Sequence, residues 1–291
     1  MQGKYIKSLR PQHWIKSGFC LAALFVSREM VSAESWGNAI PLLVIFSLIS
    51  SAGYVVNDIV NREEDRFHPR KSKRPIASGA LSMQRAILLA ALLYVGSGIT
   101  GGVLYGFNSV MGCLFGYVGL NLCYTFVLRK IVFVDIIAIS FGFVLRVMAG
   151  AYVIDIPPSE WLMGLTYFLA LLLGLGKRRG ELQVVENGEI SLGQTRTVLK
   201  WYEGDLSSFA IVLVGISIIV AYCLYCVVVQ GGFPFVFSAV PVGVAVFSYI
   251  REAGRSESVE TPENMVLKQS VLVMSFITWV VLVSYFIYIG G

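Results

Sequence analysis

The chain has 291 residues, of which 56% are hydrophobic and 14% charged, and its formal net charge is +5. Its mean hydropathy of +0.72 argues against an ordinary soluble domain, because such domains carry about 25% charged residues. The sequence therefore predicts an all-α protein that crosses a membrane several times. No nucleic-acid-binding pattern accompanies the basic charge, so we expect no nucleic-acid partner.

Nine windows are long and apolar enough to cross a hydrocarbon core of about 30 Å. In chain order they are residues 15–27, 37–56, 84–105, 109–128, 131–152, 159–176, 206–229, 233–250 and 266–289. The first is short, and we expect a tilted entry. Lys and Arg gather in cytoplasmic loops, and nine spans with the N-terminus inside place 21 of the 23 basic residues there. This pattern predicts a multi-pass protein of the inner (plasma) membrane.

A single domain covering residues 1–291 is the simplest organisation. The two largest loops between the windows, residues 57–83 and 177–205, both lie inside on this topology. We therefore expect any polar chemistry to sit at the cytoplasmic face. All five cysteines fall in apolar windows, so neither disulfides nor a zinc framework are predicted.

Acidic and amide side chains follow the second window. Asp58, Asn61 and Asp65 are spaced so that all three share one face if the helix continues, and Asn57 borders that face. Magnesium suits one or two carboxylates, with water and phosphate oxygens completing its octahedron. A loop of solvated charges is the alternative, but polar groups at the very end of an apolar span are costly and usually functional.

Basic residues complete this loop. Pro69 ends the predicted helix, and a basic turn follows it. Arg66, Lys71 and Arg74 are candidates to clamp phosphates directly.

The stretch at residues 57–65 resembles the first aspartate-rich motif of the UbiA superfamily of intramembrane prenyltransferases. Its continuation at residues 65–79, D-R-x-H-P-x-K-x-x-R-P-I-A-x-G, is similar to the decaprenyl-phosphate phosphoribosyltransferase branch. Further blocks of the same resemblance are R-P-x-x-W-x-K at 10–16, Y-[S/T]-x-x-L-[K/R] at 124–129, Val134-Asp135-Ile136, F-x-x-R-x-x-A-G at 143–150 and G-K-R-x-x-E-L at 176–182. The family commonly has Asp where this chain has Asn61, which puts that ligand in doubt.

The loop after the sixth window differs from that of a prenyl-transferring relative. Prenyl-transferring relatives usually carry a second aspartate motif, D-x-x-x-D, in this loop. This chain has Lys177, Arg178 and Arg179 instead, and Glu181 is the nearest carboxylate. Basic groups favour binding a phosphate without a metal. The alternative is a cluster of positive charges that only orients the helix in the membrane.

The resemblance implies a UbiA-like arrangement of helices around a central cavity, with loops 57–83 and 177–205 capping a cytoplasmic active site. It also implies a transferase activity. The implied donor is 5-phosphoribosyl diphosphate, the acceptor a polyprenyl phosphate such as decaprenyl phosphate, and the cofactor Mg²⁺ held by Asp58 and Asp65. Lys177 would act with these acids, and the lipid phosphate is itself the nucleophile. The alternative enzyme is a UbiA-type prenyltransferase with an aromatic or other polar acceptor. A transporter would place polar residues near mid-membrane in several spans, and only Arg146 lies deep.

Other residues are weaker candidates for contact with substrate. Tyr124 contacts substrate or belongs to the interfacial aromatic belt. Arg146 supports a cavity wall or snorkels outward, and Glu181 orients Lys177 or receives a ribose hydroxyl. The remaining candidates, which carry charge near span ends, are Lys16, Arg129, Lys130, Asp135 and Arg178.

Overall fold

The computed structural model describes residues 3–67, 71–186, 202, 205–229, 233–253 and 269–288. Within these ranges, eight helices are long and apolar enough to cross a membrane, and each falls on a predicted window. They are α3 (Ala33–Val60), α5 (Met83–Tyr105), α6 (Ser109–Phe126), α7 (Val134–Val153), α8 (Glu160–Glu186), α9 (Asp205–Val228), α10 (Ala239–Ala253) with the preceding 3-10 helix η7 (Phe233–Ser238), and α12 (Ser270–Tyr288).

The first predicted window has a different structure. Residues 15–27 lie mostly in the 3-10 helix η1 (Pro11–Leu21) and the single turn α2 (Ala22–Phe25), so a ninth long helix is not confirmed in the described part of the chain. Hydropathy reports only how apolar a segment is, whereas its backbone geometry follows from its packing. At Gly150 of α7, an added Cβ would overlap the Cys20 carbonyl of η1. The backbones of η1 and α7 therefore meet without an intervening side chain.

The chain forms two compact units. The first comprises Met1–Ala22, Ser32–Ala138 and Leu145–Pro157, and the second comprises Ala23–Val31, Ile139–Val144 and Pro158–Gly291. The first unit also holds the short helices α1 (Gly3–Leu9), α4 (Arg62–Phe67), η3 (Lys71–Lys73) and η4 (Leu128–Lys130).

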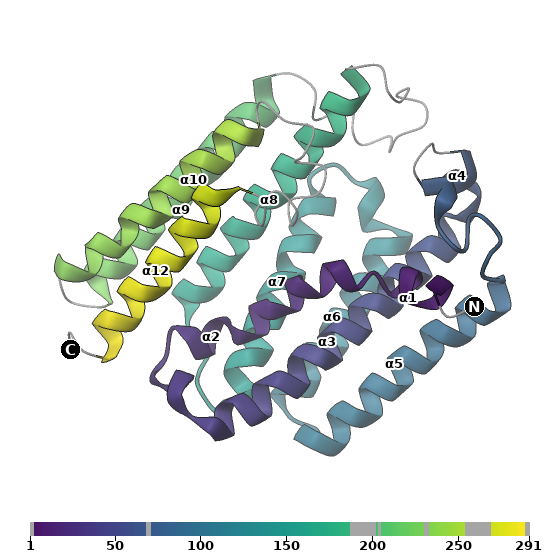
Figure 1. Ribbon diagram of the computed structural model, residues 1–291, viewed down its shortest axis with the longest axis horizontal. Helices are drawn as coiled ribbons and strands as arrows, with labels where there is room; N and C mark the ends of the chain where they lie inside the picture. Colours follow the sequence, from purple (N-terminus) through teal and green to yellow (C-terminus); the bar gives the residue numbers. More distant parts are fainter. Residues whose placement is uncertain are drawn as a thin grey trace. The chain divides into compact units, whose positions relative to one another are not determined.

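Helix α3 is the centre of the first unit. It packs against α5, α6, η1 and α1, as Figure 1 shows for the α3–α5 pair. Small residues permit this close packing: Ala52 is fully buried, and Gly53 faces Asn121 of α6. Val55 near the end of α3 joins a buried cluster with Ile76 of the following loop. That cluster fixes the segment carrying the predicted acid face.

In the second unit α8, α9, α10 and α12 pack side by side (Figure 1). A short polar chain crosses their apolar core: Trp279 donates from its indole nitrogen to the Tyr222 hydroxyl at 2.7 Å, and that hydroxyl is 2.9 Å from Ser238 Oγ. The pairing satisfies polar groups that lipid cannot hydrate. Cys226 is buried in this core, and all five cysteines are free thiols.

Candidate active site

The predicted acid face lies where α3 gives way to α4. The Asn61 N–H donates to the Asn57 carbonyl at 3.0 Å, and the Asp65 N–H donates to the Asn61 carbonyl at 2.8 Å. Helical hydrogen bonding therefore continues across the junction. As a result Asp58, Asn61 and Asp65 keep the common face that their spacing predicts, and they expose only 2%, 6% and 5% of their surface.

Two arginines reach this buried cluster. Arg10 donates to Asp58 Oδ1 at 2.5 Å. Arg74 donates from a single nitrogen to Asp58 Oδ1 at 3.0 Å and to Asp65 Oδ2 at 2.6 Å. Because one nitrogen touches both carboxylates, the two acids converge on the same point. The cluster is thus two acids neutralised by two guanidinium groups.

Arg10 is the residue of this cluster that the sequence did not single out as a site residue. It adopts the left-handed conformation (φ 52°, ψ 59°) between α1 and η1, which costs a non-glycine residue about 1 kcal/mol or more. Such strain persists only where the surroundings enforce it. The available signal was its place at the head of the R-P-x-x-W-x-K block.

Contacts with α3 hold Arg10 in place. Ser51 Oγ donates to the Leu9 carbonyl at 2.8 Å, and the Trp14 indole donates to Ser51 Oγ at 2.9 Å. The guanidinium carbon of Arg10 lies 5.1 Å from the centroid of the Tyr54 ring, within cation–π range. Ser51, Tyr54 and Asp58 follow one another along one face of α3. The N-terminal segment is thereby fixed over the acids.

The donor set fits a magnesium ion. Two converging carboxylates are the usual protein share of a Mg²⁺ shell, with water and substrate phosphate oxygens supplying the rest. The amide nitrogen of Asn61 donates to Asn57 Oδ1 at 3.0 Å, whereas the buried Asn61 Oδ1 has no hydrogen-bond partner among the described residues. An orphaned acceptor beside two carboxylates suits a cation. In the described part of the chain no cluster of three or more His, Cys, Asp or Glu side chains forms a fuller metal site.

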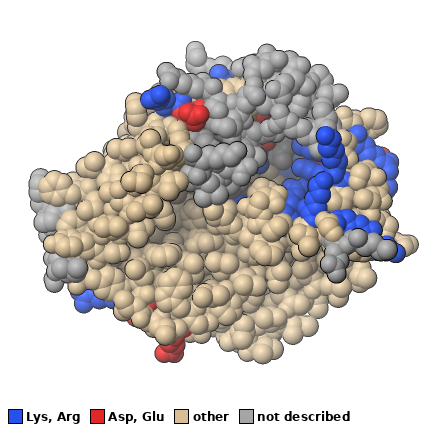
Figure 2. Space-filling model, viewed as in Figure 1, with Lys and Arg blue, Asp and Glu red and all other residues tan. Residues whose placement is uncertain are grey.

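The predicted phosphate clamps of the first loop separate into two groups. Arg74 lies in the acid cluster. Arg66 instead donates from one guanidinium nitrogen to both carboxylate oxygens of Glu63, at 3.1 and 2.9 Å, and from Nε to the Ala77 carbonyl at 3.4 Å. Arg66 is thus engaged by its own loop. Lys71 is half-buried in η3, while His68 and Pro69 lie outside the described residues. Figure 2 shows Lys and Arg gathered over the region of α1, α4 and η3.

The remaining candidates of the first unit lie near helix ends. Lys16 is half-buried in η1, six residues or two 3-10 turns beyond Arg10. Tyr124 and Arg129 are half-buried and Lys130 is exposed, close to the end of α6 and in η4. Asp135 is fully buried in the first turn of α7, where the helix dipole favours a carboxylate. Their contact with substrate stays a prediction.

Arg146 does not snorkel. It is 4% exposed, and its guanidinium donates to Ser50 Oγ at 2.9 Å and to the Tyr117 hydroxyl. Its guanidinium carbon lies 4.3 Å from the centroid of the Tyr117 ring and 5.8 Å from that of Phe46. These contacts argue against outward snorkelling, and a role for Arg146 in a cavity wall stays a prediction. Arg146 joins α3, α6 and α7 inside the first unit.

The basic cluster after the sixth window belongs to the last turns of α8. Arg178 is 2% exposed and donates to Glu181 Oε2 at 2.5 Å, while Lys177 and Arg179 are half-buried. Glu181 thus pairs with Arg178, three residues before it on the same helix face, and its predicted contact with Lys177 stays a prediction. The loop that follows, residues 187–201, lies outside the described residues, so its capping role stays a prediction.

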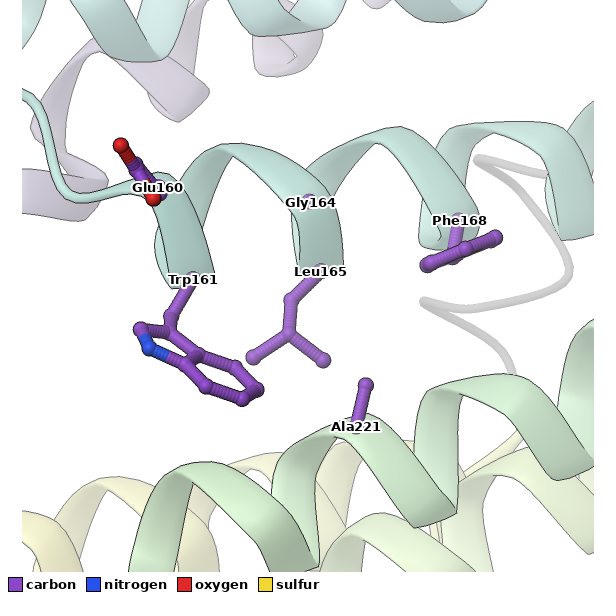
Figure 3. A pocket seen from close by; sticks show the side chains of 6 residues that line it. All are labelled: Glu160, Trp161, Gly164, Leu165, Phe168 and Ala221. Carbon is purple, nitrogen blue, oxygen red and sulfur yellow. The ribbon is translucent and has the colours of Figure 1, made fainter. Parts of the chain in front are cut away.

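An apolar hollow of about 260 Å³ lies between α8 and α9. It is lined by Glu160, Trp161, Gly164, Leu165, Phe168 and Ala221. In Figure 3, Trp161 and Leu165 lie on the side of α8 that faces α9, and Glu160 points away from it. Lys177 is nine residues beyond Phe168, the nearest lining residue on α8, which is about 14 Å along the helix at 1.5 Å per residue. The hollow is therefore separate from the basic cluster.

These features define a class: an α-helical protein that crosses the membrane repeatedly, with a buried acid and arginine cluster at the end of its central helix. The UbiA prenyltransferase family matches residues 18–276. The chain belongs to that family, which confirms the resemblance predicted from its motifs.

Relatives and solved structures agree with this assignment. The chain is 30% identical over 290 residues to the decaprenyl-phosphate phosphoribosyltransferase of Mycolicibacterium smegmatis, covering 94% of this chain and 89% of that protein. It is 29% identical to the enzyme of that name from Corynebacterium glutamicum, covering 98% and 86%. A UbiA homolog from Archaeoglobus fulgidus, solved with DMAPP and Mg²⁺, superposes with a TM-score of 0.74 at 15% identity, covering 99% of this chain and 100% of that one. The last likeness supports the fold alone.

Proposed function

We propose that this protein transfers 5-phosphoribose from 5-phosphoribosyl diphosphate to a polyprenyl phosphate and releases diphosphate, in a reaction that depends on Mg²⁺. The observation that carries the proposal is near-full-length similarity to proteins named for this reaction. Decaprenyl phosphate is the acceptor in their names. The active site would face the cytoplasm at the inner membrane, where the basic loops gather.

The chemistry of the α8 end supports this reaction over prenyl transfer. A prenyltransferase of this kind would carry a second aspartate cluster at this place, whereas this chain has Lys177, Arg178 and Arg179. Arg178 pairs with Glu181, and we assign Lys177, one residue before it, to a substrate phosphate. An ammonium group binds phosphate oxygens directly as a point charge.

In the proposed reaction, a lipid phosphate oxygen attacks C1 of the ribose while the bond from C1 to the diphosphate oxygen breaks. The bonding electrons leave with the diphosphate, and no proton has to be removed from an ionised phosphate. A magnesium ion bound by the acids would supply the positive charge that stabilises this leaving group. Asp58 and Asp65 would hold the ion, and the Asn61 amide oxygen would offer a neutral third ligand. Arg74 is placed to donate hydrogen bonds to phosphate oxygens beside it.

The test uses membranes containing the full chain, supplied with Mg²⁺, polyprenyl phosphate and donor carrying radiolabel in its ribose. We expect label to enter the lipid fraction, and chelation of the metal to stop it. A matched reaction supplies a tritiated prenyl diphosphate and an aromatic acceptor instead. Prenylated product in the second reaction and no labelled lipid in the first would overturn the proposal in favour of a UbiA-type prenyltransferase.

A further inference from the structure

The acid cluster has no net charge in the absence of a metal ion. Asp58 and Asp65 contribute two negative charges, and Arg10 and Arg74 return two positive ones through direct ion pairs. The side chains of both acids are at most 6% exposed, and those of Arg10 and Arg74 are 15% and 25% exposed. Buried charges need such partners, since an uncompensated one is strongly destabilising.

Arg10, one of the two arginines on Asp58, is held in place by contacts outside the acid cluster. The left-handed backbone at Arg10, the Leu9–Ser51 hydrogen bond and the Tyr54 ring hold its guanidinium against α3. Asp58 Oδ1 accepts from both arginines, so one of the two carboxylate oxygens already has two charged hydrogen-bond donors. An exposed, freely rotating cation could move into water when an ion arrived, whereas these contacts keep the Arg10 guanidinium close to the acids.

A divalent ion entering alone would therefore meet two obstacles. It must displace guanidinium groups from the carboxylates, and it would leave a buried site with an excess of two positive charges. A diphosphate removes both obstacles, because its oxygens accept hydrogen bonds from guanidinium groups and its charge balances the ion. The acids then pair with the metal and the arginines pair with the diphosphate.

We propose that Arg10 is a positioning residue that keeps Asp58 neutralised in the resting protein, so that the metal ion binds together with a diphosphate and only weakly by itself. The inference rests on the proposed metal role of Asp58 and Asp65, but it does not depend on which diphosphate ester is the donor. It assigns Arg10 a role in the order of binding, through the charge it brings to the site.

The test measures binding of Mn²⁺ to the purified full chain by electron paramagnetic resonance, with and without inorganic diphosphate. For the wild-type protein we expect diphosphate to tighten Mn²⁺ binding by about tenfold or more, and by reciprocity Mn²⁺ to tighten diphosphate binding equally. Titrations corrected for the Mn²⁺ complex that forms in solution give the affinity of the protein itself. Equal Mn²⁺ affinity with and without diphosphate would overturn the inference, and this arm needs no variant.

The variant arm compares Arg10→Gln with Lys7→Gln. Lys7 donates to the Lys73 carbonyl and touches neither acid, so it controls for the loss of one positive charge from the same segment. Without diphosphate we expect Arg10→Gln to bind Mn²⁺ about tenfold more tightly than wild type, since one charge-assisted pair is removed. Lys7→Gln should stay within about twofold. Unchanged affinity in Arg10→Gln, or equal gains in both variants, would overturn the inference.

Failure of the metal site itself has a different signature. Asp58→Asn in the presence of diphosphate should lose the Mn²⁺ that wild type holds. If wild type binds no Mn²⁺ under any condition, the proposed metal role falls and the inference falls with it. If Mn²⁺ and diphosphate bind together but no ribose is transferred, the proposed donor is wrong and the role of Arg10 stands.

Discussion

The buried hydrogen-bonded group of Ser50, Tyr117 and Arg146, called the clasp below, gives the sharpest prediction about stability. Ser50 of α3, Tyr117 of α6 and Arg146 of α7 meet in one hydrogen-bonded group, with Ser50 Oγ and the Tyr117 hydroxyl 3.0 Å apart. Tyr117→Phe removes one hydroxyl and keeps the ring under the guanidinium. The substitution therefore isolates the hydrogen bond from the cation–π contact.

The expected loss follows from the charge of the partner. A hydrogen bond to a charged group contributes about 1.5–3 kcal/mol, whereas side-chain hydrogen bonds in a membrane protein average about 0.6 kcal/mol. Because the Arg146 guanidinium is 4% exposed and keeps Ser50 as a second acceptor, we expect a loss of about 1–2 kcal/mol. That corresponds to a melting temperature lower by roughly 2–3 °C for a chain of this size.

Tyr94→Phe is the matched control. Its hydroxyl is buried in the same unit and has no hydrogen-bond partner among the described residues, so its removal should leave stability unchanged or raise it. The assay heats purified protein in detergent and measures the fraction that remains monodisperse by size-exclusion chromatography. If Tyr117→Phe were as stable as wild type, or if both variants lost the same amount, the hydrogen-bonded clasp would be refuted.

Three further substitutions test the close helix contact and the site. Gly150→Ala places a methyl group on the Cys20 carbonyl and should destabilise the protein by about 1–3 kcal/mol, whereas Gly119→Ala meets no atom within 4 Å and should not; equal melting curves would contradict the contact. Asp65→Asn should lower turnover by more than about a hundredfold with unchanged chromatographic behaviour, and substantial activity at saturating Mg²⁺ would count against a metal ligand. Lys177→Ala should raise KM about tenfold for one substrate; unchanged KM for both would remove it from the binding site.

Hydropathy predicted the long helices well because burial in lipid requires a continuous apolar stretch. The window 37–56 lies inside α3, and the window 84–105 matches α5 to within one residue. Residues 15–27 also passed that test, yet they form mainly 3-10 helix. The contact between Gly150 and the Cys20 backbone joins residues far apart in the chain, so no local pattern announces it.

The candidate site was predictable only in its local part. The common face of Asp58 and Asp65 follows from helical spacing, and the structure keeps it. Arg10 is 48 residues from its partner Asp58, and its left-handed backbone has no glycine to signal it. The pairing of Glu181 was ambiguous for a different reason, because helix geometry permits partners at either three or four residues.

Helix α3 has a mechanical role that follows from its contacts. Ser50 ties it to α6 and α7 deep in the apolar region, and Asp58 stands two turns further along the same rigid rod. A change in bilayer thickness that tilts this rod also moves the carboxylate at its end. We therefore expect the activity of the protein in reconstituted vesicles to vary with the acyl-chain length of the lipid.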